Sequence, residues 1–159
     1  MNDLAFKSDD AFLNHQTLRL KDLIAGMNNC CEERNLIEKH RFSLPYAELK
    51  CLILFKGEKY LTVKGIALKL EVAKSRVTKL IDGLSRKGLV KRINDPEDAR
   101  IRLISLSPKG MALVDEIEKF QEHLYQEILL QLEEPERKNI LTHLETLRSA
   151  MEVVKNKFF

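Results

Sequence analysis

The segment 62–110 constrains the fold most, because it joins two short helical patterns to two strand-like segments with almost no linker between them. Thr62 is a suitable N-cap for the first pattern, and the second begins after residues 71–73. Apolar residues recur at helical spacing in both patterns: Ile66, Ala67 and Leu70 in the first, and Val77, Leu80, Ile81 and Leu84 in the second. We therefore expect two consecutive helices, the second with an apolar face for a core and a polar face left free.

The second helix should end at about Lys87, since Gly88 suits a positive φ after a helix and cations favour a helix C-terminus. Residues 89–93 predict a strand, residues 94–98 carry Asp-Pro turn chemistry, and residues 100–106 predict the returning strand. Ile104 and Leu106 share a side that can be buried near the base of this hairpin, and Arg100 and Arg102 lie nearer its tip. The order of helix, turn, helix and hairpin is that of a winged helix-turn-helix.

The hairpin resembles the wing of the MarR/SlyA-type bacterial transcription regulators in residue types and spacing. The residues that carry this resemblance are Arg92, Asp95, Asp98, Arg100, Ile104, Leu106, Ser107 and Gly110. Residues 72–90 resemble the recognition helix of the same family, and the resemblance at motif level covers residues 44–114. It implies a homodimer on double-stranded DNA, one recognition helix in each major groove, and Arg100 in the minor groove, oriented by Asp98.

The candidate DNA contacts lie on the free face of the second helix and on the hairpin: Lys74, Ser75, Arg76, Thr78, Lys79, Arg86, Asp98, Arg100 and Arg102. Residues in the N-terminal half of such a helix meet base edges. The charge distribution agrees, because residues 61–110 hold 12 Lys and Arg against 5 Asp and Glu, whereas the remainder holds 15 against 19. The net charge of +3 says little alone, but a basic cluster on one helix face and one hairpin favours nucleic acid.

Long amphipathic helices are predicted on both sides of this region, at about residues 10–38 and beyond Ser107-Pro108. A helix from about Pro45 to Gly57 and a short third strand at 60–62 complete the prediction. The last helix carries an unusually regular apolar stripe: Ile140, Leu144, Leu147, Met151, Val154 and Phe158. We expect a mainly α fold with a small β wing. The N-terminal helix of a dimerisation stem would lie in 1–44, the winged region in 45–110 and the C-terminal dimerisation helices in 111–159.

Composition and motifs argue against several functional classes. The four histidines, at positions 15, 40, 123 and 143, show no metal-ligand or catalytic spacing, so we expect no metal site, no cofactor and no enzyme activity. There is no transmembrane run, and the N-terminus lacks the pattern of a signal peptide, which favours a cytoplasmic protein without a membrane partner. The close carboxylates Asp95, Glu97 and Asp98 are better explained by fixing the turn.

Three cysteines without a CxxC pair suit a reducing compartment. Cys31 and Cys51 follow apolar stripes and are expected to be small core residues, whereas Cys30 faces elsewhere. A junction between winged region and stem is the candidate site for an effector, either a small aromatic or acidic ligand or an oxidant. Its candidate residues are Met27, Cys30, Cys31, Arg34, Tyr46, Lys50 and Met111. A ligand is favoured, because Glu32 and Glu33 would raise a nearby thiol pKa.

The sequence therefore predicts a sequence-specific DNA-binding transcription regulator, a repressor released by a ligand or an oxidant, that binds a pseudo-palindromic operator as a homodimer. The alternative is a winged-helix module for protein interaction or assembly without direct DNA readout. A protein-binding face would more often carry apolar or aromatic anchors than the basic residues seen here.

Overall fold

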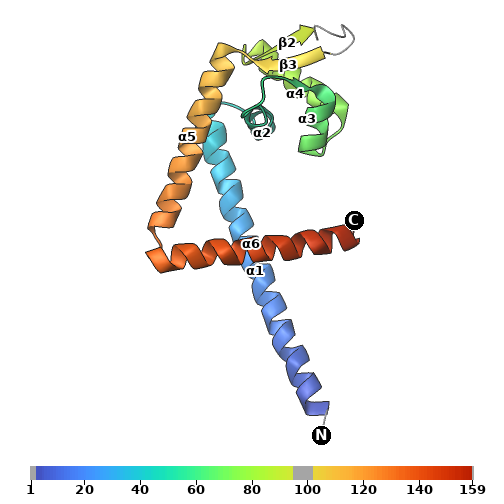
Figure 1. The fold of residues 1–159 in the computed structure, drawn as a ribbon, viewed down its shortest axis with the longest axis vertical. Coiled ribbons are helices and arrows are strands. Elements are labelled where there is room, and N and C mark those ends of the chain that lie inside the picture. Colours follow the sequence, from blue (N-terminus) through green and yellow to red (C-terminus); the bar gives the residue numbers. More distant parts are fainter. Residues whose placement is uncertain (1–2, 95–101, 159) are drawn as a thin grey trace. The chain divides into compact units, whose positions relative to one another are not determined.

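The computed structural model describes residues 3–94 and 102–158, with side chains from residue 10 onward (Figure 1). The helices and strands are α1 (Asp3–Phe42), α2 (Tyr46–Ile53), β1 (Leu61–Thr62), α3 (Val63–Leu70), α4 (Lys74–Arg86), β2 (Val90–Asn94), β3 (Arg102–Leu106), α5 (Pro108–Leu130) and α6 (Glu134–Phe158). The predicted fold class, mainly α with a small β wing, is confirmed. The chain divides into two compact units, residues 1–111 and 112–159, and each is described by itself.

The sheet is antiparallel, with strand order β1-β3-β2. Val90 lies opposite Leu106 at the base of the β2–β3 hairpin, and Asn94 lies opposite Arg102 at its far described end. Leu61 of β1 pairs with Ile104 of β3, so the expected third strand is present. The first strand of the hairpin is displaced by one residue from the predicted 89–93, because Leu89 still bonds back to the last turn of α4 through its amide and the carbonyl of Leu84.

We call the first unit, residues 1–111, the winged unit. Its core is built from one face of each short helix. Val77, Ile81 and Leu84 of α4 are completely buried, as predicted, and contacts link α4 to both α2 and α3. Ile66 of α3 and Ile104 of β3 are also completely buried, whereas Leu80 and Leu106 are only half-buried. Each fully buried Leu or Ile stabilises the fold by roughly 1.5–3 kcal/mol. The sequence stripe therefore identified the inner face of α4 correctly, with Leu80 at its margin.

The ends of α3 and α4 and the start of α5 follow the predicted chemistry. Thr62 Oγ1 accepts a hydrogen bond from the amide of Gly65 at 3.0 Å, and Ser107 Oγ accepts one from the amide of Gly110 at 2.9 Å. Gly88 has φ of +71°, the left-handed conformation expected after α4. A Cβ on Gly110 would lie 2.0 Å from the carbonyl oxygen of Leu89, so the start of α5 can approach the wing only with glycine at this position.

The boundaries of two helices, α1 and α2, differ from the predictions. α1 extends well beyond the expected 10–38 at both ends, because no glycine or proline interrupts it there. α2 ends at Ile53 rather than near Gly57, since residues 54–57 form turns that close on Gly57 at φ of +71°. Pro45 is the N-cap of α2, one residue before the helix, rather than part of its first turn.

The apolar stripes of α1 and α6 are largely exposed. On α1, Met27 is 53% exposed and Cys31 is also exposed, so the prediction that Cys31 is a core residue is wrong for the single chain. The physical reason is that nothing in residues 10–94 and 102–111 covers this part of the helix. α6 contains no buried residue at all, and Leu144 and Met151 on its stripe are 39% and 52% exposed.

Candidate nucleic-acid interface

The outer face of α4 presents a continuous row of polar side chains to solvent. Lys74, Ser75, Arg76, Thr78 and Lys79 are all exposed, in contrast to the inner face of the same helix. This division arises because the apolar residues recur at i, i+4 and i+7 and draw one side of the helix into the core. Four polar types with different donor and acceptor groups therefore lie along one exposed helical edge.

The N-terminus of α4 has no side-chain cap. Ala73 occupies the N-cap position, and its carbonyl accepts the amides of Arg76 and Val77 at 3.0 and 3.3 Å. Amide groups at such an end, together with the helix dipole, favour a nearby negative charge. The side chains of Lys74 and Arg76 add two exposed positive charges at the same end. This end of α4 is thus electropositive for both backbone and side-chain reasons.

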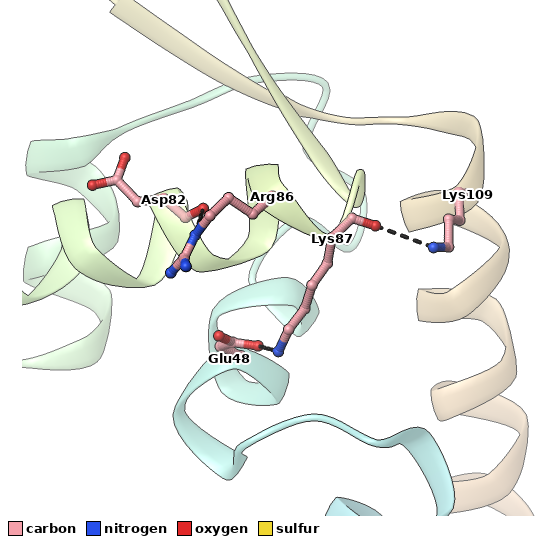
Figure 2. A network of polar contacts seen from close by, with 5 residues as sticks. All are labelled: Glu48, Asp82, Arg86, Lys87 and Lys109. Atoms are coloured by element: carbon pink, nitrogen blue, oxygen red, sulfur yellow. Dashed lines mark hydrogen bonds and ion pairs between the residues drawn. The ribbon is translucent and has the colours of Figure 1, made fainter.

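The wing is attached to α4 through an ion pair. A terminal guanidinium nitrogen of Arg92, on β2, lies 2.5 Å from Oδ1 of Asp82, on α4. The carbonyl of Asp82 also accepts a hydrogen bond from Nε of Arg86 at 3.4 Å, one turn later (Figure 2). Arg102 is exposed on β3, opposite Asn94. The candidates Asp98 and Arg100 lie outside the described residues.

Sequence reasoning missed three residues at the opposite end of α4. The carboxylate of Glu48, on α2, accepts a hydrogen bond from Nζ of Lys87 in an ion pair across the helix end (Figure 2). A Cβ on Gly83 would lie 2.6 Å from Oε1 of Glu48, so the glycine makes room for this carboxylate. Gly83 inside an otherwise regular helix was the available signal, since glycine there needs a packing reason.

The candidate effector residues are in part engaged elsewhere. Arg34 lies 3.7 Å from the buried carboxylate of Glu38 in the next turn of α1. Nζ of Lys50 lies 5.1 Å from the ring centre of the half-buried Tyr46, so these two candidates do meet. Met111 is 50% exposed at the start of α5. A cavity between the end of α1 and the start of α2 has a different lining: Lys39, His40, Ser43, Leu44 and Pro45.

The cysteines have contrasting environments. Cys30 and Cys31 are exposed on α1, whereas Cys51 is completely buried in α2, as predicted. Burial, and secondarily the nearby Glu48 carboxylate, raises the pKa of the Cys51 thiol to about 12. Cys51 is therefore protonated at neutral pH and lacks the thiolate that reacts with oxidants.

In the described part of the chain, His, Cys, Asp and Glu side chains form no group of three or more that could hold a metal ion. No helix among residues 3–94 and 102–158 combines the length and apolar character needed to cross a membrane.

The winged region is similar in sequence to a known protein family. Residues 44–101 match the model of the MarR family. The HTH-type transcriptional regulator PrsX of Escherichia coli is 31% identical over 104 residues, which span 60% of this chain and 63% of PrsX. An uncharacterized HTH-type transcriptional regulator of Bacillus subtilis, YsmB, is 38% identical over 65 residues, or 40% of this chain and 44% of YsmB. The chain thus spans less than two thirds of the length of these curated relatives.

Solved structures show the same fold. A MarR family protein from Bacillus stearothermophilus superposes with a TM-score of 0.77 at 22% identity, covering 87% of this chain and 97% of the other. Streptococcus pneumoniae FabT in complex with DNA gives 0.76 at 18% identity, covering 85% and 99%. Apo MarR from E. coli gives 0.64 at 25% identity, covering 78% and 93%. Residues 44–101 are thus similar to the MarR family, and the described residues have the winged helix-turn-helix fold of these structures.

Proposed function

We propose that this protein is a sequence-specific DNA-binding transcription regulator that binds a pseudo-palindromic operator as a homodimer. The observation that carries the proposal is the polar face of α4, which is exposed along its N-terminal half, whereas Val77, Ile81 and Leu84 on its other face are fully buried. An exposed helix of this kind matches the width of the DNA major groove. FabT and MepR, which share the fold, have structures described as complexes with DNA.

We assign different roles to the two parts of the interface. Ser75, Arg76, Thr78 and Lys79 would meet base edges, since they occupy the N-terminal half of α4. Lys74, Arg86 and Arg102 are exposed cations suited to phosphates. The family resemblance adds Arg100 in the minor groove, held in orientation by Asp98. The basic wing and helix together would supply affinity and readout.

The proposed dimer follows from the exposed stripes of α1 and α6. Exposed apolar residues on α6 include Ile140, Leu144 and Met151, and those on α1 include Leu20, Leu23 and Met27. Rows of exposed large apolar residues on a helix are typical of an interaction surface. A second copy of the chain would cover it and would present two copies of α4 to two half-sites about one helical turn of DNA apart.

The direct test is a gel shift of the purified protein against the DNA upstream of its own gene, repeated at increasing salt. Several Lys and Arg contacts to phosphates should release counterions, so affinity should fall on the order of a thousandfold between roughly 50 and 200 mM salt. Binding that is absent, or that hardly responds to salt, would contradict the proposal. It would favour the winged-helix module for protein interaction instead.

We further propose that the protein is a repressor released by an effector at the junction of winged region and stem. A ligand that prefers a DNA-incompetent spacing of the two wings would weaken binding without unfolding the protein. A small aromatic or acidic ligand is favoured over an oxidant. The triple variant with Ser at Cys30, Cys31 and Cys51 separates the two in a DNA-binding assay with peroxide. If wild type responds to peroxide and the variant does not, the oxidant is the signal, whereas no response in either protein leaves the ligand.

A further inference from the structure

Glu48 is a nearly buried carboxylate that lies against the C-terminal half of α4, the helix to which we assign base contacts. Glu48 is only 9% exposed. One of its two carboxylate oxygens, Oε2, pairs with Nζ of Lys87 just beyond the helix end (Figure 2). The Lys87 side chain is 39% exposed, so the pair lies at the edge of the core rather than in bulk solvent. Water screens such a pair less than an ion pair on the surface.

The glycine at position 83 gives a second, independent sign that the carboxylate belongs there. Its place inside α4 is unfavourable for the helix, because glycine is one of the weakest helix formers. A Cβ at this position would lie only 2.6 Å from the other carboxylate oxygen of Glu48, Oε1. Glycine has no Cβ and therefore leaves room for that oxygen. The helix thus has a glycine where the carboxylate of Glu48 packs against it.

Lys87 also connects the helix end to α5. Its carbonyl accepts a hydrogen bond from Nζ of Lys109 at 3.1 Å, and Lys109 lies in the first turn of α5 (Figure 2). Next to it, the carbonyl of Gly88 accepts a hydrogen bond from Oγ of Ser107 at 2.6 Å. The C-terminal end of α4 is therefore held by polar contacts from two different elements.

We propose that Glu48 and Lys87, with Gly83 making room for the carboxylate, are positioning residues that fix the angle at which α4 presents Arg76 and Lys79 to DNA bases. α4 has 13 residues, so its ends lie about 20 Å apart, and a tilt of about 10° at one end moves the other by roughly 3 Å. A displacement of that size is as large as a hydrogen bond is long. This inference rests on the proposed DNA binding.

The variant Glu48→Gln tests the proposal because charge alone predicts the opposite result. Removing a carboxylate makes the protein more cationic, which should strengthen binding to any DNA. Loss of the positioning pair should instead weaken binding to a sequence that wild type selects from a random duplex library, by roughly tenfold. Binding to a scrambled duplex of the same composition should be unchanged or tighter.

Glu58→Gln is the matched control. Glu58 also forms an ion pair with a lysine in the winged unit, Lys69, at 2.9 Å, but both side chains are 45% exposed. This variant loses the same charge without touching α4, so its preference for the selected duplex should equal that of wild type.

Gly83→Ala supplies a second variant whose effects on stability and on readout should have opposite signs. Alanine favours the helix, and only the carboxylate end of the Glu48 side chain needs to move, so thermal stability should be kept or raised. The preference for the selected duplex over the scrambled one should nevertheless fall. The double variant Glu48→Gln/Gly83→Ala should show no further loss, since both changes disrupt one arrangement.

The possible outcomes separate the positioning role from the proposed function. If wild type selects no sequence, DNA readout itself is refuted. If wild type selects a sequence and Glu48→Gln and Gly83→Ala prefer it as strongly as Glu58→Gln does, the positioning role is refuted. A merely structural pair would lower the melting temperature in Glu48→Gln and leave the preference of the folded protein unchanged, which also overturns the proposal. Should Glu48→Gln fail to fold, Gly83→Ala decides alone.

Discussion

The helices α4 and α6 are both amphipathic, but only α4 has its apolar face covered within its own unit. Val77, Ile81 and Leu84 of α4 are fully buried, whereas Ile140 and Leu144 of α6 are 41% and 39% exposed. The spacing of apolar residues is equally regular in the two helices. Periodicity therefore identifies the face that avoids water, but it does not say whether the same unit or a partner covers it.

The cysteines repeat this comparison on a smaller scale. Cys31 and Cys51 both continue an apolar stripe, and both were expected to be core residues. Cys51 lies in α2, whose short stripe packs into the winged unit, and is fully buried. Cys31 lies on α1, in a part of the helix that its own unit leaves open, and is exposed. A long helix can extend past the core that would cover it, and its sequence pattern does not record where the core ends.

The largest expected effect comes from placing charges on the uncovered stripe. Leu144→Glu with Leu147→Glu would bury two carboxylates in a dimer interface, which costs several kcal/mol. The protein should sediment as a monomer with its winged unit folded. Affinity for a duplex with two half-sites should fall on the order of a thousandfold, because the second site no longer gains from the first.

The control for this variant uses the polar face of the same helix. Thr146→Glu with Ser149→Glu has the same spacing, and both hydroxyls bond to carbonyls of their own helix at 3.0 and 2.9 Å. This control should remain dimeric. A Leu144→Glu/Leu147→Glu protein that also stays dimeric would show that α6 is not the interface.

An Ile→Ala substitution in α4 and another in α6 should show whether the apolar stripe of each helix is covered by its own chain or by the partner chain. Ile81→Ala removes a fully buried side chain from the winged core and should destabilise it by about 2–5 kcal/mol at any protein concentration. Ile140 is 41% exposed, so Ile140→Ala should weaken only the dimer. Urea unfolding at several protein concentrations distinguishes them, because the destabilisation by Ile140→Ala should be absent at concentrations too low for the dimer to form and should grow as the dimer becomes populated. Concentration-independent destabilisation by Ile140→Ala would place that residue in a core of its own unit.

The polar face of α4 should determine DNA sequence preference, whereas the polar face of α6 should not. Arg76→Ala in α4 should lose about 1–3 kcal/mol of discrimination at one base position. Arg148→Ala on α6 removes the same charge from an exposed residue and should not change sequence preference. Arg100→Ala in the wing should weaken binding to all sites, apart from an effect on A·T-rich flanks. Equal, sequence-blind losses from Arg76→Ala and Arg100→Ala would refute this division of roles.

Most of the winged unit could be predicted from sequence, because its signals are local. The cap at Thr62, the left-handed Gly88 and the hairpin each depend on a few neighbouring residues, and the structure contains all three. The pair of Glu48 and Lys87 could not be predicted, since it joins residues 39 positions apart. The sequence on either side of Glu48 or of Lys87 does not indicate that the two residues pair. The sequence signal was Gly83, because a glycine inside a helix indicates close packing by a group from another element.

The smallest expected effect concerns how the two helices begin. α4 follows a turn in which Glu71 has φ of +53°, and among the described non-glycine residues only Ser43 shares a positive φ; α6 begins without such a residue. The left-handed conformation costs a residue with a Cβ about 1–2 kcal/mol, and glycine avoids this cost but gains entropy in the unfolded chain. Glu71→Gly should therefore be more stable than Glu71→Ala by roughly 0.5–1 kcal/mol in urea unfolding. The alanine variant is the proper reference, because it loses the contacts of the Glu71 side chain and keeps the Cβ. A glycine variant no more stable than the alanine variant would mean that the turn before α4 relaxes out of the left-handed region when the glutamate is removed.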